Sequence, residues 1–208
     1  VLRSAGPAGI IGSMDLQRRI RDHFEDSARL KREAAEVLAG PIAEAVELIT
    51  AALASDRKLL VCGNGGSAAD SQHLAAELIG RFERERPELA AIALTTDSSI
   101  LTAIANDYAF EQVFAKQVRG LGREGDVLVA ISTSGNSPSV LAAAQAARER
   151  GLAIVALTGR GGGQLGEMLG EGDVHLCVPH ERTARIQEVH LLIVHCLCDG
   201  IDLSLMGE

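Results

Sequence analysis

Five short apolar runs recur along the chain, and segments with helical spacing separate them. The runs cover residues 59–62, 91–95, 127–132, 153–158 and 174–178. Each is rich in β-branched residues or closely bounded by turn signals, which is typical of strands. Strands that alternate with helices form βαβ units, in which a parallel sheet is covered by helices on both faces. The sequence therefore predicts an α/β fold built on a parallel sheet.

Length and composition narrow the class of protein. The chain has 208 residues, of which 47% are hydrophobic, enough for one α/β domain with helical additions. A net charge of -8 argues against a basic nucleic-acid-binding face, and we see no apolar run of transmembrane length. None of the four cysteines forms a CxxC pair, so we expect free thiols in a reducing compartment. We therefore expect a cytoplasmic protein without direct nucleic-acid or membrane partners.

The N-terminal segment divides into two parts. Residues 1–13 end in a Gly-Ser before Met14, which looks like an expression-tag remnant, so we assign residues 14–208 to a single domain with an N-terminal helical extension. Residues 14–54 have helical spacing, and Gly40-Pro41 predicts a break between two helices. We expect the first helix to pack on a partner subunit; the alternative is a helix that packs on its own domain.

Two turns that follow predicted strands have the composition of anion sites. The first strand is followed by Gly63-Asn64-Gly65-Gly66-Ser67, with Ser67 as the predicted N-cap of the next helix. The third is followed by Ser132-Thr133-Ser134-Gly135-Asn136-Ser137, with Pro138 in the first turn of a helix. Neutral donors and helix dipoles at the carboxyl ends of strands suit a phosphate monoester. The alternative is a turn rich in helix caps that binds nothing. Neither the dinucleotide nor the Walker spacing is present, so NAD and ATP are not favoured.

Four polar residues of two predicted helices suggest acid–base or metal chemistry. His73 and Glu77 are four residues apart and share one helix face, and Gln187 and His195 share a face of the C-terminal helix. Two imidazoles, a carboxylate and an amide oxygen can bind zinc, although glutamine is an unusual ligand. The alternatives are a surface His–Glu pair and a hydrogen-bonded core histidine. Asn106-Asp107 is either a sugar-binding pair or an ordinary loop cap.

Together, several segments carry a resemblance to a known family. They are CGNGGSAADSQHLAAEL, TTDSSILTAIANDY, GDVLVAISTSGNSPSV, ALTGRGGG and ARIQEVHLLIVH. On these segments the chain resembles the sugar isomerase (SIS) domain family and, within it, the phosphoheptose isomerases. The resemblance implies a three-layer αβα sandwich with a five-stranded parallel sheet, and a homotetramer whose active sites lie at subunit interfaces. It also implies interconversion of sedoheptulose 7-phosphate and D-glycero-D-manno-heptose 7-phosphate, toward the heptose of the lipopolysaccharide core.

The same resemblance assigns roles to individual residues. The implied substrate-binding residues are Asn64, Gly65, Gly66, Ser67, Glu77, Asn106, Asp107, Ser132, Thr133, Ser134, Ser137 and Gln187. The implied zinc ligands are His73, Glu77, Gln187 and His195. An aldose–ketose exchange moves one proton between C1 and C2 and another between their oxygens, through a cis-enediol. We expect Glu77 to act as the base at carbon and His195 as its acid–base partner.

A second class of function stays open at this point. The chain is also similar to a non-catalytic relative of the same fold family, the DnaA initiator-associating protein, notably in RFERERP, TAIAND, AKQVR and CLCDGID. That relative regulates replication, and DnaA would be the partner under this alternative. In the family pattern the regulator lacks counterparts of Glu77 and His195, which this chain keeps. The enzyme is therefore the favoured interpretation.

Overall fold

The computed structural model describes residues 13–207, so the predicted tag remnant lies outside the described residues except for Ser13. The strands are β1 (Leu59–Gly63), β2 (Ala91–Ala93), β3 (Val127–Ser132), β4 (Ala153–Thr158) and β5 (Val174–Cys177). The helices are α1 (Ser13–Ala54), α2 (Gly66–Ile79), α3 (Ser98–Asp107), α4 (Val113–Leu121), α5 (Pro138–Glu149), α6 (Gly163–Met168) and α7 (Thr183–Met206), with 3-10 turns η1 (Phe110–Gln112) and η2 (Arg160–Gly162). All five predicted strands are present.

The five strands form one parallel sheet in the order β2-β1-β3-β4-β5. From β1 the chain moves outward to β2, and it then returns to place β3 on the other side of β1. Gly63 at the end of β1 lies opposite Ile131 of β3. The topological switch point therefore lies between β1 and β3, where ligands of open α/β sheets bind.

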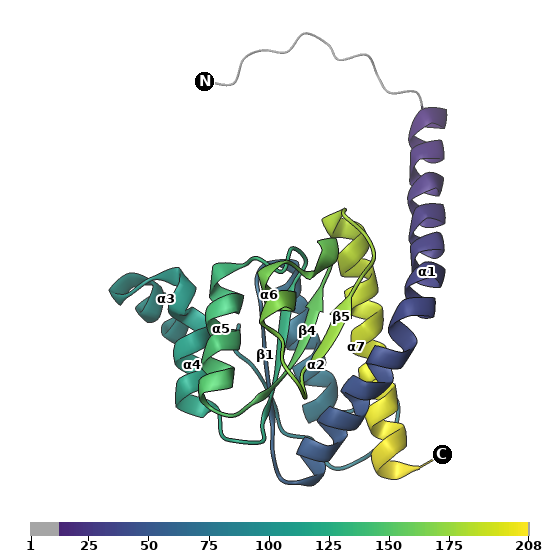
Figure 1. Cartoon of the computed structure of the whole chain (residues 1–208). Helices are drawn as coiled ribbons and strands as arrows, with labels where there is room; N and C mark the ends of the chain where they lie inside the picture. The colour runs from purple at the N-terminus through teal and green to yellow at the C-terminus, as the bar shows by residue number, and fades with distance from the viewer. Residues whose placement is uncertain (1–12, 208) are drawn as a thin grey trace, which may run out of the picture.

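Two helical layers cover the sheet, and each has its own apolar core (Figure 1). Alternate strand residues point to opposite faces. Leu59 and Val61 contact the layer of α1, α2 and α7, whereas Leu60 and Cys62 contact the layer of α4, α5 and α6. The arrangement is the three-layer αβα sandwich that the sequence and the resemblance predicted.

The prediction of two N-terminal helices is wrong, because α1 is one helix of 42 residues with Pro41 inside it. Pro41 has no N–H to donate to the carbonyl of Val37, four residues earlier. Val37 is 54% exposed, so water can solvate that carbonyl and the helix continues. Farther along, Leu38 and Ile49 are buried in the core, which holds this half of α1 against the domain.

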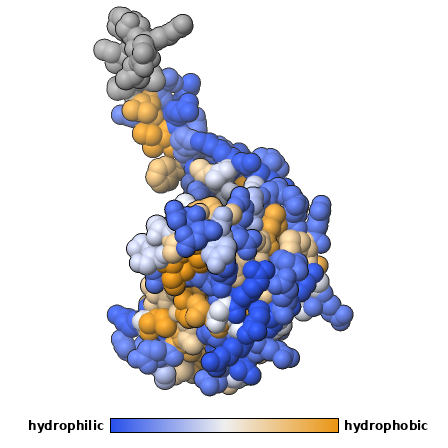
Figure 2. All heavy atoms as spheres, turned by 90° about the vertical axis from the view of Figure 1, so that its left-hand side faces the viewer, coloured by the Kyte–Doolittle hydropathy of each residue, from blue (hydrophilic) through white to orange (hydrophobic). Residues whose placement is uncertain are grey.

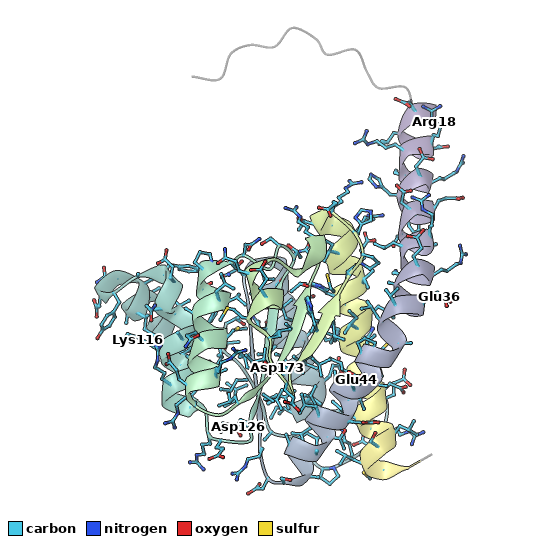
Figure 3. All side chains as sticks on the ribbon, in the orientation of Figure 1. Arg18, Glu36, Glu44, Lys116, Asp126 and Asp173 are labelled. Carbon is cyan, nitrogen blue, oxygen red and sulfur yellow. The ribbon has the colours of Figure 1, made fainter. Side chains whose placement is uncertain are left out.

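The N-terminal part of α1 projects beyond the rest of the molecule, with Arg18 near its free end (Figures 1 and 3). Leu16, Ile20 and Phe24 on this part are exposed, Phe24 by 75%. Figure 2 shows apolar side chains on this projection and on the face that α3 occupies. Exposed apolar side chains of this kind are common at protein–protein contacts, and the contact of α1 with a partner subunit stays a prediction.

Contrary to the sequence expectation, two helices are long and apolar enough to span a membrane by length and composition alone: residues Asp15–Ala54 of α1, and α7. α7 packs against α1 and α2 and buries polar residues such as His190 and Asp202. Core helices of soluble proteins pass the same test, so this feature is weak support for a membrane protein.

Candidate functional site

The two predicted anion turns meet at the switch point between β1 and β3. Asn64, directly after β1, donates from its side-chain nitrogen to the hydroxyl of Ser139 on α5, at 2.9 Å. α2 begins at Gly66 and α5 at Pro138, so both helices start beside this contact. Two helix N-termini that converge at the carboxyl ends of parallel strands form a site for an anion.

The turn after β3 is tightly built and carries a buried hydroxyl with no partner. Ser132 is 4% exposed, and its Oγ has no hydrogen-bond partner within the described part of the chain. Gly135 has a φ of 65°, and a Cβ there would collide with the carbonyl of Gly162, so only glycine fits. Thr133 and Ser134 are half-buried and accessible from outside.

Asn136 fixes this turn to the start of α6. Its side-chain nitrogen donates to the Ser134 carbonyl at 2.9 Å, and its side-chain oxygen accepts from the backbone of Gln164 at 3.0 Å. The backbone N–H of Leu165 donates to the Gly135 carbonyl at 2.9 Å. The turn is therefore held in one conformation by the protein itself, which lowers the cost of ordering it around a ligand.

The prediction that Ser67 caps α2 is wrong. The N-cap is Gly65, which has a φ of 57° and makes no side-chain cap bond, and Ser67 lies in the first helical turn. Ser67 is buried, and its carbonyl accepts from the hydroxyl of Ser71 at 2.7 Å. Gly65 has no side chain that could cap α2, and the turn itself satisfies two donors of the first helical turn. The N–H groups of Ser67 and Ala68 donate to the backbone carbonyls of Asn64 and Gly65, both at 3.0 Å.

His73, Glu77 and His195 gather where α2 packs against α7, a contact that the sequence by itself did not reveal. The Nε2–H of His73 donates to Glu77 Oε1 at 2.9 Å. The rings of His73 and His195 are edge to face with centroids 5.1 Å apart, and the centroid of the Phe82 ring is 5.7 Å from that of His195. The cluster therefore brings together a carboxylate and two imidazoles, all half-buried, which are side chains that can act as general acids and bases.

The four predicted zinc ligands do not converge within one subunit. The side chain of Gln187 lies against Gly66, at the start of α2. His73 is seven residues farther along that helix, a rise of ~10 Å. Among residues 13–207, no group of three or more His, Cys, Asp or Glu side chains is arranged to hold a metal ion. The donor types suit zinc, but their arrangement here does not form its site, and the zinc site stays a prediction.

The sequence indicated no functional role for two further groups beside this cluster, Cys198 and Asp70. Cys198 is buried, and burial, with Glu77 and Asp202 nearby, raises the pKa of its thiol to about 12 despite the opposing charge of Arg86. Asp70 lies one turn before His73, and burial raises the pKa of its carboxyl while His73 lowers it. Cys198 is therefore a neutral thiol, and its proximity to Glu77 is visible only in the folded structure.

Asn106 and Asp107 lie away from the cluster within one chain. They end α3, which packs on η1 and α4 and stands out from the domain (Figure 1). Their side chains contact each other, with the Asn106 nitrogen donating to Asp107 Oδ1 at 2.7 Å. Both are exposed, so a role in sugar binding would require a site completed by another subunit.

Comparison with known proteins decides the family. The SIS domain model matches residues 22–159. A phosphoheptose isomerase of Aromatoleum aromaticum is 68% identical over 194 residues, which cover 93% of this chain and 98% of that protein. The chain belongs to the phosphoheptose isomerase family of SIS-domain proteins.

Solved structures agree with this assignment. The phosphoheptose isomerase of Neisseria gonorrhoeae superposes with a TM-score of 0.86 at 58% identity, covering 90% of this chain and 98% of that one. The phosphoheptose isomerase of Francisella tularensis superposes with a TM-score of 0.87 at 46% identity, covering 89% and 97%. These relatives support the isomerase interpretation and give no support to the DnaA-binding alternative.

Proposed function

We propose that the protein is an aldose–ketose isomerase that interconverts sedoheptulose 7-phosphate and D-glycero-D-manno-heptose 7-phosphate. The observation that carries this proposal is near full-length identity of 68% to a protein named phosphoheptose isomerase. The site is chemically suited to the task, because it combines an anion-binding turn with a cluster of acid–base side chains.

In this proposal the phosphate sits at the switch point. Ser132, Thr133, Ser134 and Ser137 donate hydroxyl hydrogen bonds, and the N-termini of α2 and α5 add backbone donors and positive dipole ends. Asn64, Gly65, Gly66 and Ser67 line the α2 side. The unpartnered hydroxyl of Ser132 supports this assignment, because a buried donor without a partner is costly unless a ligand completes it.

The proton transfers fall to the cluster between α2 and α7. Glu77 removes the proton from the carbon next to the carbonyl and returns it to the neighbouring carbon, through a cis-enediol. His195 moves the proton between the two oxygens. The hydrogen bond between His73 and Glu77 holds the Glu77 carboxylate in its orientation. General acid–base steps of this kind each contribute about 10²–10⁴-fold.

The assembly and setting of the enzyme are parts of the same proposal. A homotetramer with sites between subunits would cover the exposed apolar side chains of α1 and could bring Asn106 and Asp107 to a neighbour's site. A cytoplasmic location and a role in lipopolysaccharide-core heptose synthesis follow from the family. Zinc, if bound, would polarise the substrate carbonyl; the steps above rely on the chain's own residues.

The test is turnover of sedoheptulose 7-phosphate by the tag-free protein, followed by NMR in D₂O. An enediol route incorporates solvent deuterium at the carbon that exchanges its proton. Glu77→Gln should reduce turnover and deuterium incorporation by about 10²-fold or more, because it removes the base. Glu85→Gln is the matched control, since Glu85 is exposed and pairs on the surface with Arg81, and its rates should match wild type. Wild-type turnover in Glu77→Gln would refute the assignment of the base.

A further inference from the structure

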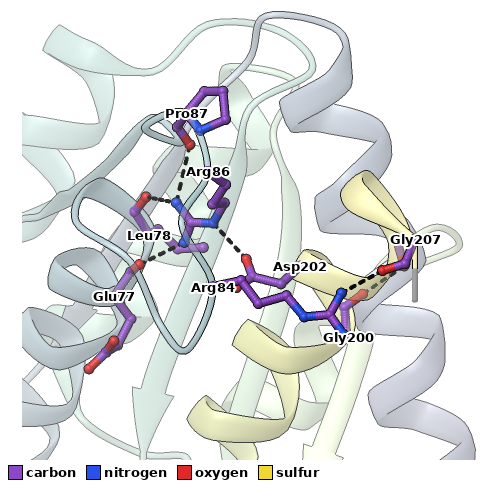
Figure 4. Close-up of polar contacts among 9 residues, drawn as sticks. Glu77, Leu78, Arg84, Arg86, Pro87, Gly200, Asp202 and Gly207 are labelled. Carbon is purple, nitrogen blue, oxygen red and sulfur yellow. Dashed lines mark hydrogen bonds and ion pairs between the residues drawn. The ribbon is translucent and has the colours of Figure 1, made fainter.

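Arg86 lies among charged residues in the segment between α2 and β2, and its side chain is buried. Its side chain is only 1% exposed. One terminal nitrogen donates to the Leu78 carbonyl at 2.8 Å and the other to the Glu77 carbonyl at 2.7 Å. Its Nε donates to Asp202 Oδ1 of α7 at 2.6 Å (Figure 4). One guanidinium therefore joins the last turn of α2 to α7.

The positive charge of Arg86 is balanced at both of its contacts, the carbonyls at the end of α2 and the carboxylate of Asp202 on α7. The last carbonyls of a helix have no partner within the helix and carry the negative end of its dipole. The Arg86 guanidinium satisfies two of them at the end of α2, and the Asp202 carboxylate, 5% exposed, balances its charge. The planar fork of arginine makes these bonds simultaneously, which the single ammonium of lysine cannot do in the same geometry.

The contacts of Arg86 lie on the two helices that carry the proposed acid–base cluster. Arg86 bonds the backbone of Glu77 itself, and Asp202 lies about two turns of α7 beyond His195. We propose that Arg86 is a positioning residue of the isomerase, which sets the carboxylate of Glu77 relative to His195 by fixing α2 against α7. This inference rests on the acid–base roles proposed above for Glu77 and His195. Arg86 is too buried to reach substrate itself.

The chain offers a matched control two residues away. Arg84 belongs to the same segment and also bonds α7's end, donating to the Gly207 carbonyl at 2.6 Å (Figure 4). Arg84 is exposed, however, and its bond does not involve α2. A substitution at Arg84 therefore removes an arginine and a link to the end of α7 while leaving the Glu77 backbone contact intact.

The main experiment separates positioning from stability. Arg86→Met alone would leave Asp202 buried without its partner, which is destabilising. The double variant Arg86→Met/Asp202→Leu removes both charges and replaces them with apolar side chains of similar size, an exchange that often preserves stability. Thermal unfolding, kcat and KM are measured for this variant, for Arg84→Met and for wild type. Arg86→Lys is a second single variant that retains a charge beside Asp202.

We expect the double variant to stay folded and to lose about 10²-fold in kcat, because an error of about 1 Å in a catalytic group has that effect. KM should change by less than about threefold, since Arg86 bonds the last turn of α2, whereas the phosphate site lies at the opposite end of that helix and on the turn after β3. Arg86→Lys should lie between the double variant and wild type, and Arg84→Met should match wild type. A folded double variant with kcat within about twofold of wild type would refute the inference, as would an equal loss in Arg84→Met.

The inference and the proposed function can fail separately. Activity in Glu77→Gln would overturn the acid–base roles whatever Arg86 does. An inactive Glu77→Gln beside a fully active, folded Arg86→Lys and double variant would overturn only the positioning role of Arg86. If the double variant fails to fold, the kcat of Arg86→Lys decides: a loss confined to kcat supports positioning, and wild-type kcat refutes it.

Discussion

His190 makes the stability of the protein depend on pH in a way that can be calculated. The ring is fully buried in α7, and its Nε2–H donates to the Thr158 carbonyl at the end of β4, at 2.9 Å. Its Nδ1 has no partner in the described residues. Burial lowers the pKa of His190 from 6.5 to about 4, although the bond to Thr158 opposes the shift. The folded protein therefore holds this ring neutral.

The sign of the effect follows from the two pKa values. Between pH 6.5 and about 4 the unfolded chain takes up a proton at His190 that the folded chain cannot. The free energy of unfolding therefore falls as the pH falls through this window, by about 1.4 kcal/mol per pH unit. Over the whole window the loss is about 3 kcal/mol, a large share of the stability of a typical domain.

His190→Gln tests this calculation, because glutamine keeps a donor for Thr158 and does not titrate. Urea unfolding, followed by far-UV circular dichroism at fixed protein concentration, gives the free energy of unfolding at several pH values between 7.5 and 4. The variant should be less stable than wild type at pH 7.5, and the gap should shrink by about 3 kcal/mol toward pH 4. Two parallel curves would refute the reasoning.

Three further perturbations address the site and the fold. Ser132→Ala should raise KM about tenfold without lowering the melting temperature, because its hydroxyl has no protein partner to lose; steady-state kinetics with thermal unfolding checks both, and an unchanged KM would contradict the phosphate site. Asp126→Asn should lower the free energy of unfolding by about 2 kcal/mol or more, because Asp126 accepts hydrogen bonds from Lys58 and from the Arg123 backbone. Asp126 directly precedes β3, at the amino ends of the strands and away from the site (Figure 3). Burial raises the pKa of Asp126, but these hydrogen bonds outweigh burial and lower the pKa overall. The carboxylate therefore stabilises the fold above its ordinary pKa of 3.8, and this stabilisation is lost as the pH falls through the pKa of the folded state. In urea titrations the free energy of unfolding of Asp126→Asn should lack this decrease at acid pH. Dialysis against a chelator should leave the secondary structure unchanged, because the predicted zinc ligands lie outside both apolar cores; loss of the circular dichroism signal would show a structural metal.

Much of the architecture follows from local sequence patterns. The alternation of apolar runs and helical segments predicted the parallel sheet, because the hydrophobic periodicity of a strand or a helix depends only on residues close together in sequence. The turns at residues 63–67 and 132–137 could be placed at one edge of the sheet, since parallel strands share a carboxyl edge. The SIS segments determined the family for the same reason, as each is a contiguous motif. Local signals also misled at Gly40-Pro41, where an exposed helix face tolerates a missing hydrogen bond.

Only the tertiary structure decided how the proposed acid–base cluster of His73, Glu77 and His195 is assembled. His73 and His195 meet because α2 and α7 pack side by side on one face of the sheet, and their separation of 122 residues leaves no periodic trace. The same holds for Arg86, whose surroundings in sequence are charged but whose partner Asp202 is 116 residues away. Burial turns an apparently solvated arginine into a link between helices, and it turns His190 into a neutral core residue. These properties depend on which surfaces the fold brings together, and local sequence spacing does not encode them.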